Sequence, residues 1–352
     1  NKVPTIPIRD LEIHEGEDDL VAASFGRGFY IVDDFSPIRE YTSGIDGKPA
    51  HLFSVKSTYQ YIVAAPEKTA TGHNFFTSPN PPYGVKLSYY LGNSILSKFE
   101  ERQNEESNKF NRGETIDYPS AKKLEDEAKE KTPKIYLTIS DSKGKVLRRI
   151  SSNKNQGYHE KYWDLRTYSQ RNIDDENNYS GPLVPPGKYS VHIEKFENDK
   201  LERLTDSYFF DIIQIGSKSS QEDRDNLFSF QLNFDELVTL VNELVDEIDQ
   251  AIEEIDGKIN KSLNSSSNSN LENLNKKKGD IMDLKMILTG TRSLNYADVF
   301  SGSPPSVQRR LGNMSWELYN TTSKPTKTHE MTYKISKAKY DEVLKSFREI
   351  MD

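Results

Sequence analysis

The sequence contains no cysteine among its 352 residues, so neither a disulfide bond nor a thiolate metal site contributes to its fold. It also lacks any apolar run close to the roughly 20 residues that a membrane-spanning helix needs. Only 34% of the residues are hydrophobic, whereas 29% are charged. A chain this polar favours several small cores joined by solvated segments over one large core.

Sequence motifs of common enzymes are missing as well. There is no P-loop, no Gly-x-Ser-x-Gly and no triad arrangement, and the six histidines show no His-x-x-x-His spacing for zinc. Gly26-Arg27-Gly28 lacks the third glycine of a dinucleotide-binding loop and leads into a strand, which indicates a turn that needs glycine. The formal net charge of −8 argues against nucleic acid as a partner. We therefore assign no catalytic, cofactor-binding or metal-binding residue.

The middle of the chain is organised around residues 157–193. One strand pattern ends at Trp163-Asp164-Leu165-Arg166, and another follows the turn Pro185-Pro186-Gly187-Lys188-Tyr189. Apolar residues alternate in the second strand, as they do in other segments of the region: 85–91, 133–139, 146–150 and 203–213. This pattern predicts an immunoglobulin-like or fibronectin-like β-sandwich over residues 61–215. Trp163 is expected in its core, with a sugar-stacking platform as the alternative.

Residues 8–34 predict three short strands joined by tight turns, at Arg9–His14, Asp19–Ser24 and Phe29–Val32. Strands this short suit one blade of a β-propeller. Three strands do not bury both faces of a sheet alone. We therefore expect the rest of that domain upstream or on a partner, and interpret the chain, which starts at Asn1, as a fragment or processed piece of a longer protein.

The segment 98–132 interrupts the strand pattern with a run of charged residues. It predicts a solvated insertion that is partly helical, with an interaction tail as the alternative.

From Asn233 onward, the spacing of apolar residues changes to that of an amphipathic helix. Apolar residues recur at steps of three and four in four segments: about 233–259, 271–288, the stretch after Pro304-Pro305, and about 336–351. The pattern predicts an antiparallel helical bundle over residues 216–352. The same stripes would also suit a partner helix in a coiled coil.

Several of these segments resemble the last blade, and the module that follows it, of bacterial sortilin/Vps10-like propeller proteins, which carry BNR repeats and are often labelled glycosyl hydrolases. The residues that carry the resemblance are Asp10–His14, Asp19–Val21, Gly26–Asp34, Pro81–Gly84, Tyr89–Leu91, Trp163–Arg166 and Pro185–Tyr189. The resemblance implies the last propeller blade with a connector over residues 1–60. It also implies an FlgD-type Ig-like module and a bacterial protein that is secreted, periplasmic or on the cell surface. The cysteine-rich module of eukaryotic sortilins is absent, so their receptor function does not carry over.

One cluster of a histidine and five acidic residues invites a chemical interpretation: His14, Glu17, Asp18, Asp19, Asp33 and Asp34. Paired carboxylates serve glycosidases, and oxygen ligands bind divalent cations, but turn carboxylates more often cap backbone amides. Asp174, Glu176 and Asn178 lack the glycine and distal glutamate of an EF-hand, which favours a plain acidic loop.

Taken together, the sequence predicts a non-catalytic C-terminal scaffold or interaction region of an exported propeller protein. Its structural residues would be Gly26, Gly28, Trp163, Asp164, Arg166, Pro186, Gly187 and Tyr189. Two alternatives stay open. One is an accessory part of a glycoside hydrolase whose active site lies on upstream blades. The other is a carbohydrate-binding sandwich that uses Tyr158 and Tyr162. The expected partners are upstream blades or a protein that completes the sheet at 8–34, with a glycan as a further candidate.

Overall fold

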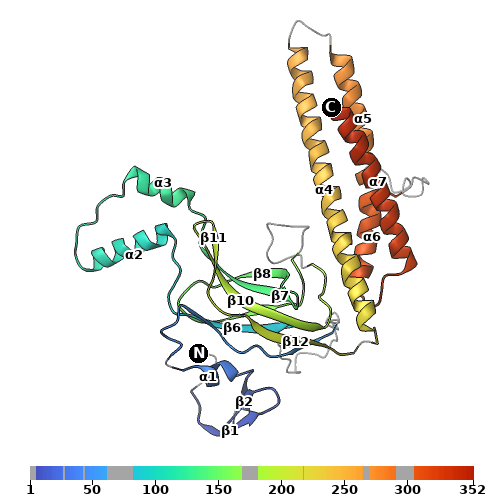
Figure 1. Cartoon of the computed structure of the whole chain (residues 1–352). Helices are drawn as coiled ribbons and strands as arrows, with labels where there is room; N and C mark the ends of the chain where they lie inside the picture. The colour runs from blue at the N-terminus through green and yellow to red at the C-terminus, as the bar shows by residue number, and fades with distance from the viewer. Residues whose placement is uncertain are drawn as a thin grey trace. The chain divides into compact units, whose positions relative to one another are not determined.

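The computed structural model describes residues 5–26, 28–42, 44–61, 82–168, 181–216, 218–264, 270–290 and 305–352. It is a mixed β and α protein in which β-sheets precede a helical C-terminal region (Figure 1). The chain forms two compact units. The first comprises Asn1–Gln60, Lys68–Leu165 and Gly187–Ile213, and the second comprises Tyr61–Glu67, Arg166–Pro186 and Gln214–Asp352. Unit 1 thus contains Asn1–Gln60 together with most of the central strands, and the domain boundary near residue 60 stays a prediction.

The first sheet of unit 1 contains β1 (Ile8–His14), β2 (Asp19–Ser24) and β3 (Phe29–Val32), paired antiparallel in chain order. The three strands predicted here are confirmed. Gly26 and Gly28 lie between β2 and β3 with φ of +77° and +91°, values that residues with a Cβ rarely adopt. The N–H of Ser24 donates to the carbonyl of Gly28 at 3.0 Å, which closes this turn.

Two further sheets make up the rest of unit 1. The larger has the order β5-β12-β10-β7-β8, with β11 paired to β10, and the smaller has the order β4-β6-β9. Their bounds are β4 Ala50–Leu52, β5 Thr58–Gln60, β6 Val85–Leu91, β7 Lys134–Asp141, β8 Val146–Ser152, β9 Gly157–Trp163, β10 Gly187–Glu197, β11 Lys200–Arg203 and β12 Tyr208–Gln214. The strands at either end of the 157–193 stretch, β9 and β10, therefore belong to different sheets.

The strand predicted over 203–213 is confirmed only from Tyr208 onward, as β12, because the chain turns between β11 and β12. The N–H of Ile193 donates to the hydroxyl of Thr205 at 3.0 Å, and the N–H of Leu204 donates to the carbonyl of Ile193 at 2.9 Å. A side-chain oxygen thus replaces a backbone carbonyl in the ladder, a local competition that alternation of apolar residues does not reveal.

The core of unit 1 lies between the larger and the smaller sheet. Trp163 at the end of β9 is fully buried, and its ring centroid lies 5.8 Å from that of Tyr189 and 6.2 Å from that of Phe210. Alternate residues of β6, β7 and β10 fill the same space: Leu87, Tyr89, Ile135, Leu137, Ile139, Val191 and Ile193. Gly84 permits this packing, since a Cβ there would lie 1.9 Å from the carbonyl oxygen of Trp163.

The charged insertion forms two helices, α2 (Lys98–Asn111) and α3 (Ala121–Lys129), as the sequence predicted in part. Neither helix buries a residue. Ser97 and Glu100 form a capping box at the start of α2. The guanidinium of Arg102 donates to both oxygens of Glu127 at 2.7 and 2.9 Å, which holds the two helices together by charge.

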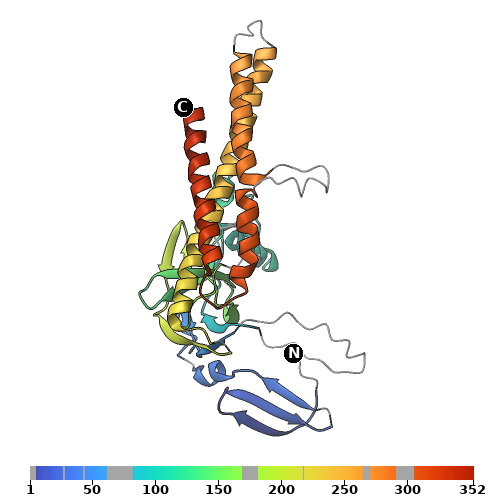
Figure 2. The ribbon, with the colours of Figure 1, turned by 90° about the vertical axis from the view of Figure 1, so that its right-hand side faces the viewer.

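Unit 2 contains α4 (Gln221–Leu263), α5 (Leu271–Thr289), α6 (Val307–Tyr319) and α7 (Lys327–Met351), and every pair of these helices is in contact (Figures 1 and 2). Helix α5 runs antiparallel to α4, and ion pairs of Lys285 with Asp249 and of Lys278 with Asp256 join the two helices. The four helices share one core, which includes Leu237, Val241 and Leu311 from the predicted apolar stripes and also Leu227, which lies before the predicted start of the first helix. Among the described residues, no helix is both long and apolar enough to cross a membrane.

Two of these helices start earlier than predicted, α4 at 221 rather than 233 and α7 at 327 rather than 336. The hydroxyl of Ser220 accepts the N–H of Asp223, and Thr326 forms a capping box with His329. Capping groups fix these starts, whereas the prediction followed the apolar stripe alone.

Candidate interaction surface

The sheet β1-β2-β3 exposes apolar side chains on a face where a core is expected. In an antiparallel pair, residues directly opposite each other share a face. The register places Leu11 opposite Ala22 and Ile13 opposite Leu20, and β3 continues both rows. The resulting apolar face consists of Leu11, Ile13, Leu20, Ala22, Tyr30 and Val32. None of the six is buried, and Leu11, Ile13 and Val32 are 58%, 44% and 46% exposed.

The opposite face of the same sheet mixes apolar and acidic residues. This acidic face consists of Asp10, Glu12, Val21, Ala23, Phe29 and Ile31. Phe29 and Ile31 are 74% and 59% exposed. No residue of β1, β2 or β3 is buried on either side. The sheet therefore lacks a core of its own within the part of the chain that the structure describes.

The acidic cluster predicted at this sheet does assemble in part, but around cations. Arg39 Nη2 lies 2.6 Å from Asp18 Oδ1, and Lys56 Nζ lies 3.4 Å from Asp18 Oδ2 and 3.1 Å from Asp34 Oδ1. Hydrogen bonding from Arg39 lowers the pKa of Asp18 from its ordinary value, against a smaller opposing effect of burial. Asp19 instead accepts the backbone N–H of Asp34 at 2.9 Å.

This geometry does not suit glycoside hydrolysis or metal binding. A glycosidase needs one carboxyl group kept protonated in an apolar pocket, whereas Asp18 and Asp34 both face a lysine. No group of three or more histidine and carboxylate side chains among the described residues is arranged to hold a metal ion. The remaining members of the predicted cluster take part through backbone: Glu17 and Asp33 offer carbonyl oxygens to Lys56 and Lys86, and the carbonyl of His14 accepts the N–H of Glu17 at 3.2 Å.

Polar contacts fasten this sheet and α1 (Ser36–Glu40) to the rest of unit 1. Lys86 on β6 pairs with Glu160 at 2.8 Å and reaches the carbonyl of Asp33 at 3.4 Å. Glu40 accepts from the N–H of Ser54 at 2.9 Å and contacts His51 Nε2 at 3.1 Å. Burial works against the charged form of Glu40, yet these hydrogen bonds leave its pKa lowered. The attachment is thus made by charge and hydrogen bonding, while the apolar face stays uncovered.

The tyrosines proposed as a sugar platform lie on β9, beside this attachment. The hydroxyl of Tyr158 lies 2.6 Å from Glu160 Oε1, and its ring meets the buried Phe53 edge to face at 5.7 Å. Burial, together with the bond to Glu160, raises the pKa of Tyr158. Tyr162 is half-buried. Tyr158 is 46% exposed, and a sugar platform on β9 stays a prediction.

A pocket of about 330 Å³ in unit 1 brings a histidine near hydroxyl groups. His51 lies at its rim, oriented by Glu40, together with Thr205 and Ser207. However, the hydroxyl of Ser207 accepts from Arg203 at 2.9 Å, and that of Thr205 accepts from Ile193 N–H. Neither hydroxyl is bonded to His51, so the pocket lacks the base–nucleophile contact of acyl-transfer enzymes.

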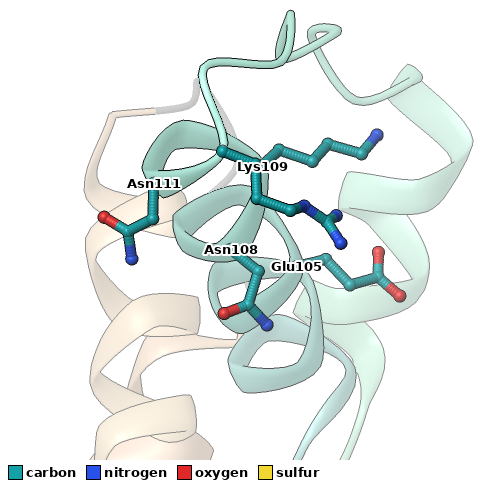
Figure 3. Close-up of a pocket in the computed structure, with 5 residues that line it drawn as sticks. Glu105, Asn108, Lys109 and Asn111 are labelled. Carbon is teal, nitrogen blue, oxygen red and sulfur yellow. The ribbon is translucent and has the colours of Figure 1, made fainter.

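A second hollow, of about 320 Å³, lies along α2 and is lined by Glu105, Asn108, Lys109, Asn111 and Arg112. Figure 3 shows that the side chains diverge, with Asn111 on one side of the helix and Glu105 and Lys109 on the other. Arg112 is paired with Glu114 at 3.0 Å. All lining residues come from α2 or from Arg112 directly after it, so no second element converges on a ligand.

The other residues singled out by sequence are not part of the β1–β3 sheet. Asp164 pairs with Arg148 at 2.7 Å, and Trp163 and Tyr189 pack in the core. In unit 2, Arg166 donates to the carbonyl of Gly181 at 3.2 Å, and Gln221 Nε2 donates to the carbonyl of Pro186 at 3.1 Å. Gly187 begins β10. Asp174, Glu176 and Asn178 lie outside the described residues.

Sequence reasoning missed the cations that hold the acidic cluster. Arg39, Lys56 and Lys86 are spread over the connector and β6, and none is part of a recognisable motif. The only available signal was the excess of acidic residues in 8–34, which called for basic partners elsewhere in the chain.

No known protein-family model matches this sequence, and neither a curated protein nor a solved structure matches it.

Proposed function

We propose that this chain is a non-catalytic scaffold region of a larger assembly, and that the β1–β3 sheet is where it binds another protein surface. One observation carries the proposal: within the described part of the chain, no residue of the apolar face of that sheet, from Leu11 to Val32, is buried. A sheet that exposes a complete apolar face is a sign of protein–protein contact. Two or three strands alone are marginally stable in water, so a cover would also stabilise the sheet.

The finer architecture belongs to the same proposal. We interpret the β1–β3 sheet as a partial blade of a β-propeller, since propeller blades are small antiparallel sheets of four short strands. The two central sheets suit an immunoglobulin-like or fibronectin-like sandwich of the FlgD type, because Trp163 packs between them. The four C-terminal helices suit a bundle, because they share one core. The resemblance to bacterial sortilin/Vps10-like proteins supports upstream propeller blades as the cover, and an exported location.

The native size and location of the polypeptide test this proposal. An antibody against residues 230–352 would be applied to fractionated cells that produce the protein, under denaturing and native conditions. We expect a denatured band far above 40.4 kDa in the envelope or the medium, because the propeller would be covalently present. A band near 40.4 kDa that migrates as a free monomer would contradict the proposal.

A matched pair of variants tests whether the apolar face is the contact. Leu11→Glu combined with Val32→Glu places two charges on the apolar face, whereas Phe110→Glu alters an even more exposed apolar residue of α2. We expect only the double variant to become sensitive to protease within residues 8–34 of the native protein. Equal sensitivity of wild type and both variants would mean that this face is not covered. Glycoside hydrolysis by the isolated chain that is lost in Asp34→Asn would overturn the non-catalytic part.

A further inference from the structure

The sheet β1-β2-β3 has two outer strands, and they differ in how well they resist pairing with another chain. Proteins protect edge strands with charges, prolines and bulges. On β1, the register is irregular between Ile8 and Asp10, and Arg9, Asp10 and Glu12 carry charge. On β3, Phe29–Val32 has no charge, no proline and a regular register with β2. Within the described residues, β3 is therefore an unprotected edge.

The hydrogen-bond pattern identifies the backbone groups that β3 presents. The N–H of Ser24 bonds to the carbonyl of Gly28, and hydrogen-bonded pairs alternate along an antiparallel ladder. The next hydrogen-bonded pairs are therefore Ala22 with Tyr30 and Leu20 with Val32. It follows that the N–H and C=O groups of Phe29 and Ile31 point away from β2, toward the open side.

The two faces of the sheet specify the side chains that a strand beside β3 would carry. Residues of that strand on one side would extend the apolar face next to Tyr30 and Val32. Residues on the other side would extend the acidic face, which bears Asp10 and Glu12. Asp33 directly follows β3 and continues the alternation of Phe29 and Ile31; it is exposed, and among the described residues its carboxylate forms no ion pair, unlike that of Asp34 with Lys56. An incoming strand with basic residues on this side would meet a complementary field.

We propose that β3 is a docking edge for a fourth strand, and that this strand is an extended peptide segment in which apolar and basic residues alternate. Its backbone pairs with Phe29 and Ile31, its apolar side chains extend the apolar face, and its basic side chains lie near Asp33. This proposal rests on the proposed function and names the chemistry of the partner. Strand addition of this kind derives affinity from main-chain hydrogen bonds and specificity from alternate side chains.

The test uses the full chain and a fluorescein-labelled peptide, acetyl-Val-Lys-Val-Lys-Val-Lys-amide, followed by fluorescence polarisation and by hydrogen exchange of the protein. We expect saturable binding at or below about 1 mM, with exchange protection in 29–32 and not in 8–14. Replacing the lysines of the peptide by glutamate should weaken binding about tenfold or more, because like charges then face each other. N-methylation of alternate peptide amides should abolish it.

A matched pair of substitutions measures the contribution of a backbone N–H of β3 to peptide binding. Ile31→Pro removes an outward N–H, which an edge strand tolerates, whereas Ile31→Thr shortens the side chain and keeps the N–H. We expect Ile31→Pro to weaken binding about tenfold relative to Ile31→Thr. Exchange of the β2 amides in both variants shows whether the sheet itself is retained, and the N-methylated peptide tests pairing without altering the protein.

Three outcomes would overturn the docking edge: no binding of the lysine peptide at about 1 mM, protection of β1 instead of β3, or equal affinity of the proline and threonine variants. None of these outcomes alters the size and location of the native polypeptide, so failure here is distinct from failure of the proposed function.

Discussion

The helical unit and the β1–β3 sheet follow the same rule of alternating polar and apolar residues, yet only one of them is complete. In the helical unit, apolar stripes of four helices meet, and residues such as Phe234, Val241 and Leu318 are fully buried. In the sheet, an apolar face forms just as regularly, and nothing in the described chain covers it. The comparison teaches that a pattern specifies which face needs a cover, but not whether the cover belongs to the same polypeptide.

The largest expected effect contrasts one leucine from each region. Leu237→Ala in α4 opens a cavity in a closed core, and we expect a loss of about 3 kcal/mol or more in the free energy of unfolding. Leu11→Ala in β1 removes a mostly exposed side chain, and we expect a change below about 0.5 kcal/mol. Urea unfolding followed by circular dichroism and by tyrosine fluorescence measures both. A comparable loss in the two variants would break the comparison, since Leu11 would then be covered within the isolated chain.

An intermediate effect contrasts two glycines with positive φ in unit 1. Gly84→Ala would press a Cβ against the backbone of Trp163 where β6 and β9 meet. We expect the free energy of unfolding to fall by more than about 2 kcal/mol. A Cβ added by Gly28→Ala would contact no other atom, so only the unfavourable φ should lower the free energy of unfolding, by about 1 kcal/mol. Thermal unfolding of the two variants, compared with the parent chain, ranks them. The reverse order would show that the β2–β3 turn is more constrained than the centre of unit 1.

The smallest effect concerns the ionic attachment of the sheet. Lys56→Met removes the cation between Asp18 and Asp34, whereas Lys345→Met removes one partner of a 3.8 Å surface pair with Glu349 on α7. We expect Lys56→Met to speed hydrogen exchange in 8–34 with little change in global unfolding, and Lys345→Met to change neither. Unchanged exchange in 8–34 would show that Lys56 does not fasten the sheet.

Hydrogen exchange in 8–34 should also depend on pH. The pKa of Asp18 is lowered in the folded chain, so its contribution is present above the ordinary value of 3.8 and is lost as the pH falls through the lower folded value. We therefore expect exchange protection of 8–34 to decline first in that acidic range. Lys56→Met should shift the decline to higher pH.

Much of the fold was predictable because its elements have strong local signals. Strands β1 to β3 follow from tight turns between apolar runs, and α5 and α6 follow from stripes with clear breaks. The early starts of α4 and α7 were missed because capping hydroxyls at Ser220 and Thr326 set them. The division of 203–213 was missed because the hydroxyl of Thr205 replaces a backbone acceptor.

The candidate surface was predictable in outline only. An incomplete sheet at 8–34 follows from counting strands, but its apolar and acidic faces depend on register, which the turn residues did not determine. The ionic attachment depends on Arg39, Lys56 and Lys86, which approach the acidic residues only after the connector folds back. Long-range charge pairing leaves no periodic trace in a sequence.

The insertion that carries α2 and α3 enters and leaves unit 1 at neighbouring points, since the N–H of Lys98 donates to Glu130 Oε2 at 2.8 Å. The two helices bury no residue of their own and contact the central sheets through charge, as in the pair of Glu100 with Lys154, so we expect the central sheets to draw little of their stability from this segment. We therefore expect that a short turn joining 97 to 131 leaves the sheets folded, and that an unrelated domain with adjacent ends can be grafted at the same place. The position between 97 and 131 would then accept a different binding module without changes to the core residues of unit 1.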